Sequence, residues 1–199
     1  MTATQKGMTV TPDLTTLDDA ELAAVLAGLD AEDEAELARL SAPDILLRSA
    51  LYYAREGHPV FPVKARGKAP ATAHGLKDAT TDVERVTAWW KATPDANIGL
   101  PSGLAFDVID IDGPAGFASL ADMQDAGVLP PIIGKSYTAG GGRHLFISPT
   151  GDRNGARLLP GVDYRGLGGY VCVPPSVGAN GRRYSWLQLL NAPRMAAVA

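Results

Sequence analysis

Apolar residues recur at helical spacing in the first half of the chain. Between residues 43 and 56 they fall on one face of an amphipathic helix, which Gly57 ends. Between residues 81 and 93 a second stripe predicts a helix that opens with a capping box formed by Thr81 and Glu84. Three other segments are predicted to be helical: residues 14–29, 30–40 and 114–126.

From residue 97 onward the pattern changes to short β-rich runs that glycine or proline residues separate. One further run lies earlier, at residues 59–63, and its prolines restrict it to a sheet edge or a strand end. The order of elements therefore predicts an α+β domain, because helices come first and mostly antiparallel strands follow. The predicted helix at residues 114–126 interrupts these strands in a βαβ-like way. The later runs cover residues 97–100, 104–111, 132–138, 143–148, 162–165, 170–175 and 184–188.

Charge divides the chain into unequal parts. Residues 1–42 carry nine acidic and two basic residues, whereas residues 43–199 carry 13 acidic and 16 basic residues. We therefore expect an acidic N-terminal appendage over residues 1–42, partly disordered and then helical, a folded domain over residues 43–190 and a C-terminal tail over residues 191–199. The mildly basic body suits a polyanionic ligand, although so small a charge is by itself weak support for one.

The composition also bears on where the protein works. No stretch has the apolar length of a membrane-spanning helix or the apolar core of a secretory signal. Cys172 is the single cysteine, so neither an internal disulfide nor a cysteine-cluster zinc site is available. These features predict a protein of the reducing cytoplasm that contacts no membrane.

Two carboxylates stand at the end of a predicted strand, in the sequence FDVIDID. Side chains alternate along a strand, so Asp110 and Asp112 share the face of Phe106 and Val108. Two like charges side by side in a buried place are unfavourable unless a cation lies between them, and Mg²⁺ prefers carboxylate oxygens. The pair is therefore a candidate metal site, and the alternative is a solvated strand end.

A triple glycine precedes the predicted strand of residues 143–148. Glycines allow backbone N–H groups to approach an anion closely, so Gly141 and Gly142 are candidates for binding phosphate. His144 opens the strand, where its imidazole is placed to form a hydrogen bond with a phosphate oxygen. The alternative is a glycine-rich hairpin turn with an incidental histidine.

A third acid, Asp163, lies on a short predicted strand and shares a strand face with Arg165. A third carboxylate beside a cation would complete a site for metal ions and a triphosphate. The alternative is a surface ion pair, which contributes little to stability.

A basic loop follows the early strand and contains Lys64, Arg66 and Lys68. These side chains are candidates for contact with nucleic acid or phosphate, and the alternative is a solvated loop. Trp89 and Trp90 have the chemistry to stack on bases, but the helical stripe predicts that Trp90 belongs to the core.

In this order the three motifs resemble those of the bifunctional primase–polymerase (prim-pol) family of the archaeo-eukaryotic primase superfamily. They are an acid pair on a strand, Gly-Gly-x-His opening a strand, and a lone aspartate followed by Arg-Gly. The resemblance also includes SALYYAREGHPVFPV, HGLKDATTD and PGVDYRGLGGYVCVPPS, and it covers about residues 47–187.

The resemblance implies an α+β prim-pol catalytic core over residues 43–190, with an RRM-like antiparallel or mixed sheet flanked by helices. Asp110, Asp112 and Asp163 match the family's catalytic acids, which would hold two Mg²⁺ or Mn²⁺ ions and no zinc. His144 matches the catalytic histidine that contacts the triphosphate of the incoming nucleotide. The groups expected to bind the nucleotide phosphates are Gly141, Gly142, His144 and Arg165.

The implied activity is template-directed nucleotidyl transfer from a (d)NTP to a 3′-hydroxyl, in the replication of a bacterial, phage or plasmid replicon. The implied partners are a single-stranded DNA template, (d)NTPs and a helicase, either a separate protein or a missing downstream domain. Two alternatives stay open. One is a non-catalytic replication-initiation or DNA-binding module on the same fold. The other is a haloacid-dehalogenase-type phosphatase, whose opening motif resembles VIDIDGP but usually has threonine where this chain has Pro114.

Overall fold

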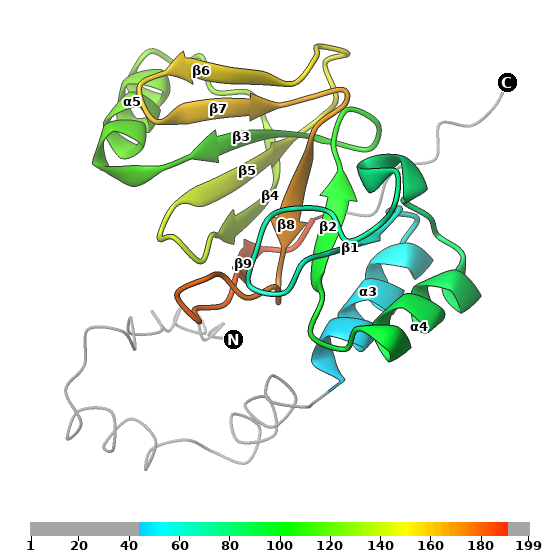
Figure 1. Ribbon diagram of the computed structural model, residues 1–199. Helices are drawn as coiled ribbons and strands as arrows, with labels where there is room; N and C mark the ends of the chain where they lie inside the picture. The colour runs from blue at the N-terminus through cyan, green and yellow to red at the C-terminus, as the bar shows by residue number, and fades with distance from the viewer. Residues whose placement is uncertain (1–43, 191–199) are drawn as a thin grey trace, which may run out of the picture. The chain divides into compact units, whose positions relative to one another are not determined.

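A computed structural model describes residues 44–190 of the protein (Figure 1). The predicted appendage of residues 1–42 and the predicted tail of residues 191–199 lie outside this range. The elements within it are α3 (Ile45–Arg55), β1 (Phe61–Val63), the 3-10 helix η1 (Gly75–Asp78), α4 (Val83–Ala92), β2 (Asn97–Pro101), β3 (Asp107–Ile111), α5 (Gly113–Asp125), β4 (Ile132–Tyr137), β5 (Arg143–Ile147), β6 (Gly155–Leu159), β7 (Val162–Arg165), β8 (Tyr170–Val173) and β9 (Ser185–Gln188).

Helix α3 follows the predicted span closely. It ends where Gly57 takes a φ of 84°, a left-handed conformation that glycine adopts without steric cost. Its buried residues are Leu46, Ala50, Tyr53 and Ala54, whereas Leu47 and Leu51 are only half-buried.

Helix α4 opens with a different cap from the predicted one. Asp82, not Thr81, is the N-cap, and its carboxylate accepts hydrogen bonds from the N–H groups of Glu84 and Arg85 at 2.9 and 3.3 Å. An aspartate is as good a cap as a threonine and also interacts favourably with the helix dipole. Trp90 is buried as predicted, and its indole N–H donates to the carbonyl oxygen of Ala96 at 2.8 Å.

The larger sheet has six strands in the order β6-β7-β3-β5-β4-β9, and every pairing between them is antiparallel. Strands β3 and β4 both run antiparallel to β5, which lies between them, so they are parallel to each other. Helix α5 connects them, as the βαβ-like interruption predicts. The α+β prediction is therefore confirmed.

A second sheet of three antiparallel strands has the order β1-β2-β8. The proline-containing strand β1 lies at its edge, where the missing N–H of Pro62 removes no hydrogen bond from a central strand. The chain passes from the large sheet to the small one between β7 and β8 (Figure 1).

The largest differences from the strand predictions lie at β3 and β6. Strand β3 begins at Asp107 rather than at residue 104, because Gly103 takes a φ of 91° and its N–H donates to the carbonyl oxygen of Phe106 in a turn. Strand β6 was not predicted, since GARLL shows no regular alternation of polar and apolar residues.

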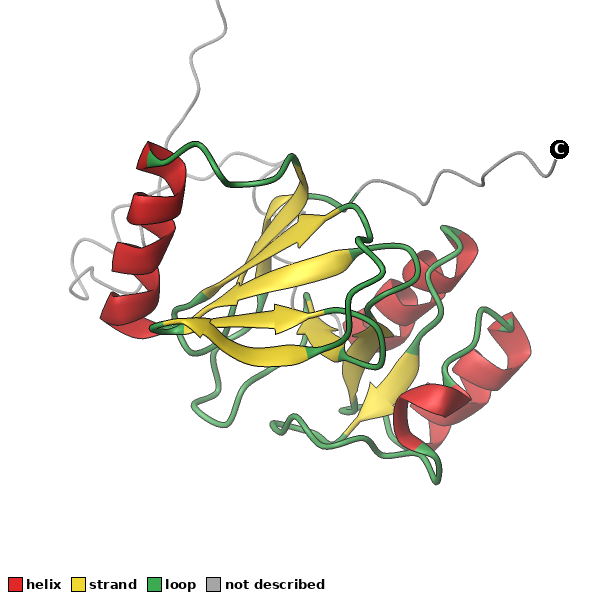
Figure 2. Ribbon diagram, turned by 90° about the horizontal axis from the view of Figure 1, so that it is seen from above, coloured by secondary structure: helices red, strands yellow, loops and turns green. Residues whose placement is uncertain are grey.

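The two faces of the large sheet pack into separate cores. Ile109 and Ile111 of β3 pack with the apolar face of α5, whereas Phe106 and Val108 join the core of α3, α4 and the small sheet. Figure 2 shows α5 on one side of the large sheet and the other two α-helices on the opposite side. With 13 residues α5 is the longest of these helices, and none in the described range is long and apolar enough to cross a membrane.

Candidate active site

Three neighbouring strands bring sequence-predicted residues to one face of the large sheet. Asp110 of β3 is the Cα partner of His144 on β5 and of Asp163 on β7. Directly opposed residues in antiparallel strands point to the same face, so these side chains are neighbours. Residues from three motifs of the sequence therefore meet at the carboxyl end of β3.

The guanidinium group of Arg165 lies between two of the acids. Its Nη2 donates to Oδ2 of Asp163 at 2.7 Å and to Oδ2 of Asp110 at 3.2 Å. Strand parity predicts a pair between Arg165 and Asp163, but it gives no indication of the contact with Asp110. One guanidinium group thus bridges two carboxylates and balances one of their two negative charges, whereas a divalent cation between them would balance both.

Burial sets the electrostatics of Asp110 and His144. Asp110 is 6% exposed, and burial raises the pKa of its carboxyl more than the Arg165 guanidinium lowers it. Nε2 of His144 lies 3.4 Å from Oδ1 of Asp110. Burial, with a smaller contribution from Lys68, lowers the pKa of His144 to about 3, so its imidazole is neutral at physiological pH.

Asp112 lies just beyond β3. It is the N-cap residue of α5, its side chain is exposed, and that side chain makes no capping hydrogen bond. Together with Asp163 it lines a hollow of about 560 Å³. Asp112 therefore borders the same hollow as Asp163, but it shares no ion pair with Arg165 among those that the structure describes.

The donor set fits a hard divalent cation at Asp110 and Asp163. These two carboxylates already share one cationic nitrogen, and the buried Asp110 needs a positive charge beside it. In residues 44–190 no three His, Cys, Asp or Glu side chains are gathered into a ready-made metal site. Asp112 is a candidate for a third ligand, because it lines one hollow with Asp163.

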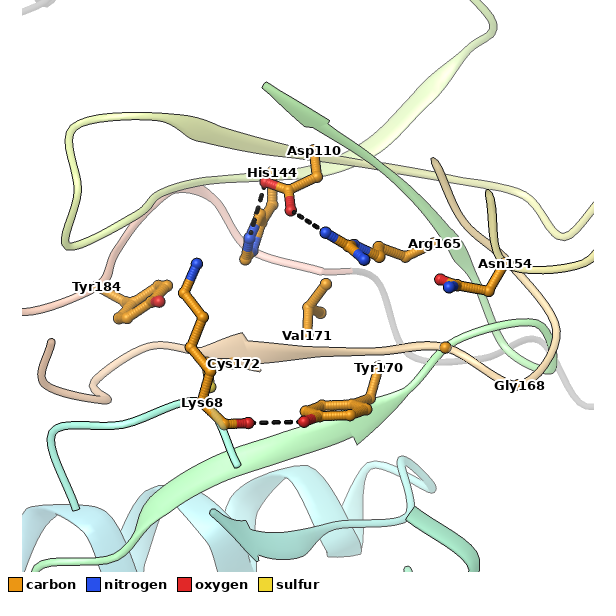
Figure 3. A pocket seen from close by; sticks show the side chains of 11 residues that line it. Lys68, Asp110, His144, Asn154, Arg165, Gly168, Tyr170, Val171, Cys172 and Tyr184 are labelled. Atoms are coloured by element: carbon orange, nitrogen blue, oxygen red, sulfur yellow. Dashed lines mark hydrogen bonds and ion pairs between the residues drawn. The ribbon is translucent and has the colours of Figure 1, made fainter. Parts of the chain in front are cut away.

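A cavity of about 290 Å³ opens beside Asp110, His144 and Arg165 (Figure 3). Lys68 lines its opposite side, and Figure 3 shows this side chain extending toward His144 and Tyr184. The cavity thus presents two cationic side chains and a neutral imidazole next to the acids. Such a set of side chains suits a ligand whose phosphate groups are bound together with metal cations.

The loop that carries Lys68 is fixed to the small sheet. The Tyr170 hydroxyl donates to the carbonyl oxygen of Lys68 at 2.6 Å, and the Asn97 amide donates to that of Gly67 at 3.1 Å. Of the other two predicted basic residues, Arg66 lines an adjoining hollow of about 420 Å³ that also includes Asp112, whereas Lys64 is an exposed residue at the start of the loop.

The glycine loop differs from the predicted phosphate nest. The N–H of Gly141 donates to the carbonyl oxygen of Thr138 at 3.0 Å, and the N–H of Gly142 donates to its Oγ1 at 2.9 Å. Both groups are therefore used inside a hairpin turn in this conformation. Gly142 instead allows close packing, because an added Cβ would lie 2.2 Å from the carbonyl oxygen of Ile111.

Seven of the residues that line the cavity were not predicted as site residues. Among them, Tyr170, Cys172 and Tyr184 line it from β8 and from the segment before β9. Burial raises the pKa of the Cys172 thiol to about 12, so this residue is protonated and unreactive there. Nothing in the sequence distinguishes these three from ordinary core positions.

Comparison with known proteins agrees with the geometry. Residues 50–196 match the Prim-Pol family, described as bifunctional DNA primase/polymerase, N-terminal. A search of curated proteins gives no match for this chain. The matched range includes Lys68 and all the acids of the site, covers more than half of the sequence, and decides against the phosphatase alternative. The chain belongs to the Prim-Pol family of bifunctional DNA primase/polymerase N-terminal domains.

Proposed function

We propose that this domain transfers nucleotidyl groups from a (d)NTP to the 3′-hydroxyl of a primer on a single-stranded DNA template. The observation that supports this proposal most directly is the placement of Asp110 between His144 and Asp163, beside a cavity that Lys68 also lines. Phosphoryl transfer needs positioning and charge neutralisation more than covalent help from the protein, and this site offers both.

Asp110, Asp112 and Asp163 would hold two divalent ions, Mg²⁺ or Mn²⁺. Ions bound there would lower the pKa of the 3′-hydroxyl and stabilise the negative charge of the leaving pyrophosphate. Because Arg165 holds Asp110 and Asp163 in the present conformation, its guanidinium has to leave these oxygens when a metal ion binds. The released side chain remains within the cavity, where phosphate oxygens would accept its hydrogen bonds.

The phosphate-binding groups come from both sheets. Lys68 supplies a positive charge from the small-sheet side, and His144 supplies a neutral N–H from the large-sheet side. In this proposal the side chains of Lys68, His144 and Arg165 bind the triphosphate. The N–H groups of Gly141 and Gly142 are left out because Thr138 accepts their hydrogen bonds.

The template is expected to pass near the basic loop. Lys64 and Arg66 are exposed there, and Arg66 lines the hollow that adjoins the catalytic cavity. A helicase, in trans or as a further domain, would supply the unwound strand for a bacterial, phage or plasmid replicon. The absence of any internal disulfide in a chain with a single cysteine is compatible with the proposed cytoplasmic location.

Primer extension with Asp110→Asn tests the proposal. Nucleotide incorporation on primed and unprimed single-stranded DNA is measured with Mg²⁺ and with Mn²⁺. We expect the variant to lose about 100-fold or more in rate, by analogy with the loss of one charge-stabilising group in other active sites. Asp125→Asn, at the exposed end of α5, is the matched control and should keep wild-type activity.

Two results would overturn the polymerase assignment. One is equal incorporation by Asp110→Asn and the wild-type protein. The other is no incorporation by the wild-type protein with either metal, combined with single-stranded DNA binding that is the same with and without Mn²⁺. The second result would support the non-catalytic module instead.

A further inference from the structure

Two buried polar atoms beneath the candidate active site have no hydrogen-bond partner. They are Oγ of Ser136 and Nδ1 of His144. Ser136 is 0% exposed and His144 is 5% exposed, so solvent does not satisfy either atom. Unpaired polar atoms are unfavourable in a protein interior and are rare in native structures. A pair of them at one place therefore calls for a physical explanation.

The two atoms belong to directly opposed residues. Ser136 of β4 and His144 of β5 are Cα partners in an antiparallel pair. Opposed side chains lie on the same sheet face with Cβ atoms about 4.5–5.5 Å apart. Nδ1 is the imidazole nitrogen nearer the backbone, and a serine hydroxyl reaches different neighbours by rotation about a single side-chain bond.

Other groups near Ser136 already have partners. Trp186 of β9 is the Cα partner of Ser136 on its other side, and its indole N–H donates to the Tyr53 hydroxyl at 2.9 Å. The Tyr53 hydroxyl in turn donates to the carbonyl oxygen of Pro174 at 2.5 Å. His144 is therefore the neighbour of Ser136 that still has an unused hydrogen-bonding atom.

The surroundings of His144 decide which nitrogen carries the proton. Nε2 lies 3.4 Å from Oδ1 of Asp110, a carboxylate oxygen that accepts hydrogen bonds. A neutral imidazole has one N–H, so a proton on Nε2 leaves Nδ1 as an acceptor. The hydroxyl of Ser136 is the donor that such an acceptor requires.

We propose that Ser136 is a positioning residue that donates a hydrogen bond to Nδ1 of His144 and so keeps the proton on Nε2. The imidazole of His144, which would accept this hydrogen bond, lines the cavity (Figure 3). Its consequence rests on the proposed function: Nε2–H is held ready to donate to a phosphate oxygen of the incoming nucleotide. Ser136 itself touches no substrate.

Imidazole ¹⁵N spectroscopy of the full chain tests this directly, without metal or nucleotide and near neutral pH. The sequence has three histidines, so His144 is identified by the signals that a His144→Gln variant loses. In the wild-type protein we expect the proton on Nε2 and a hydrogen-bonded Nδ1. In Ser136→Ala the Nδ1 resonance should move toward the frequency of an acceptor without a hydrogen bond. Ser136→Thr, which keeps a hydroxyl, should restore it.

Ser119→Ala is the matched control. Ser119 is also a buried serine, but its hydroxyl donates to the carbonyl oxygen of Pro160 at 2.9 Å, on the α5 side of the sheet. Its loss should leave the His144 signals unchanged. A proton on Nδ1 in the wild-type protein, or an Nδ1 frequency that is the same in Ser136→Ala, would overturn the proposal.

Kinetics supply a second readout. Loss of one hydrogen bond should lower kcat/KM for the nucleotide about fivefold in Ser136→Ala. The effect should be larger on KM for the nucleotide than on KM for the primed template. If the wild-type protein incorporates no nucleotide, the proposed function fails, while the ¹⁵N signals still decide the hydrogen bond.

Discussion

Arg165→Gln should tighten the binding of Mn²⁺ to the domain about fivefold, because the guanidinium group competes with the metal for the same oxygens. Its Nη2 lies 2.7 Å from Oδ2 of Asp163 and 3.2 Å from Oδ2 of Asp110. The Arg165 side chain is 28% exposed, so solvent screens part of the attraction. A partly exposed pair contributes about 1 kcal/mol, which corresponds to about a fivefold change in an equilibrium constant.

Calorimetric titration with Mn²⁺, without nucleotide, measures this change. Glutamine keeps a polar side chain of similar reach but removes the positive charge. Lys68→Gln is the matched control, since it removes the same charge from the same cavity, and no described hydrogen bond joins Lys68 to either acid. We therefore expect a smaller gain in Mn²⁺ affinity for Lys68→Gln than for Arg165→Gln.

The reasoning fails if Arg165→Gln binds Mn²⁺ no more tightly than the wild-type protein, or gains no more than Lys68→Gln. Either result would mean that the guanidinium group does not occupy the cation position. Nucleotide kinetics give an opposite expectation for the same variant. Its KM for the (d)NTP should rise. In the wild-type protein the metal ion would displace the Arg165 guanidinium from the acids, and the guanidinium would then bind the triphosphate; the variant lacks this group.

Two further variants test how the site is supported. Gly142→Ala should destabilise the domain by about 1–3 kcal/mol, because its Cβ would lie 2.2 Å from a carbonyl oxygen. Urea unfolding compares it with Gly140→Ala, whose Cβ would meet no atom nearer than 3.8 Å, and equal midpoints would contradict the packing argument. Tyr164→Phe should cost about 2 kcal/mol, because the hydroxyl donates to Oδ2 of the fully buried Asp107 at 2.5 Å. The Mn²⁺ affinity of Tyr164→Phe should stay unchanged, because Tyr164 and Asp163 point to opposite faces of the sheet. A lower Mn²⁺ affinity in the folded variant would refute this argument.

Local patterns in the sequence determined most of the elements. The alternation along residues 106–111 predicts which side chains share a face, and the structure places Phe106 and Val108 in one core and Ile109 and Ile111 in the other. The period of α4 likewise predicts a buried Trp90. Such predictions succeed because burial of a strand or helix face repeats with the geometry of the backbone itself. The N-cap of α4 was predicted wrongly because Thr81 and Asp82 are both suitable cap residues. The path of the backbone decides which of the two caps the helix.

The tertiary structure alone decided how the site is assembled. The sequence indicates Asp110, His144 and Asp163 as candidates, but only the register of β3 with β5 and β7 makes them neighbours. The register of β3 with β7 also brings Arg165 to Asp110, and the register of β4 with β5 sets Ser136 opposite His144. Strand register depends on contacts between residues that are distant in the chain, which no local period encodes.

The direction of the side chains in the loops could not be predicted from the sequence either. Of three basic residues in one loop, Lys68 lines the cavity beside Asp110 because Tyr170 and Asn97 hold the loop against the small sheet. The N–H groups of Gly141 and Gly142 bond to Thr138 because the turn closes on itself. The sequence thus determined the residue types and their strand faces. The packing of the two sheets decided which of them share one pocket, because that packing joins segments that have no local relation to each other.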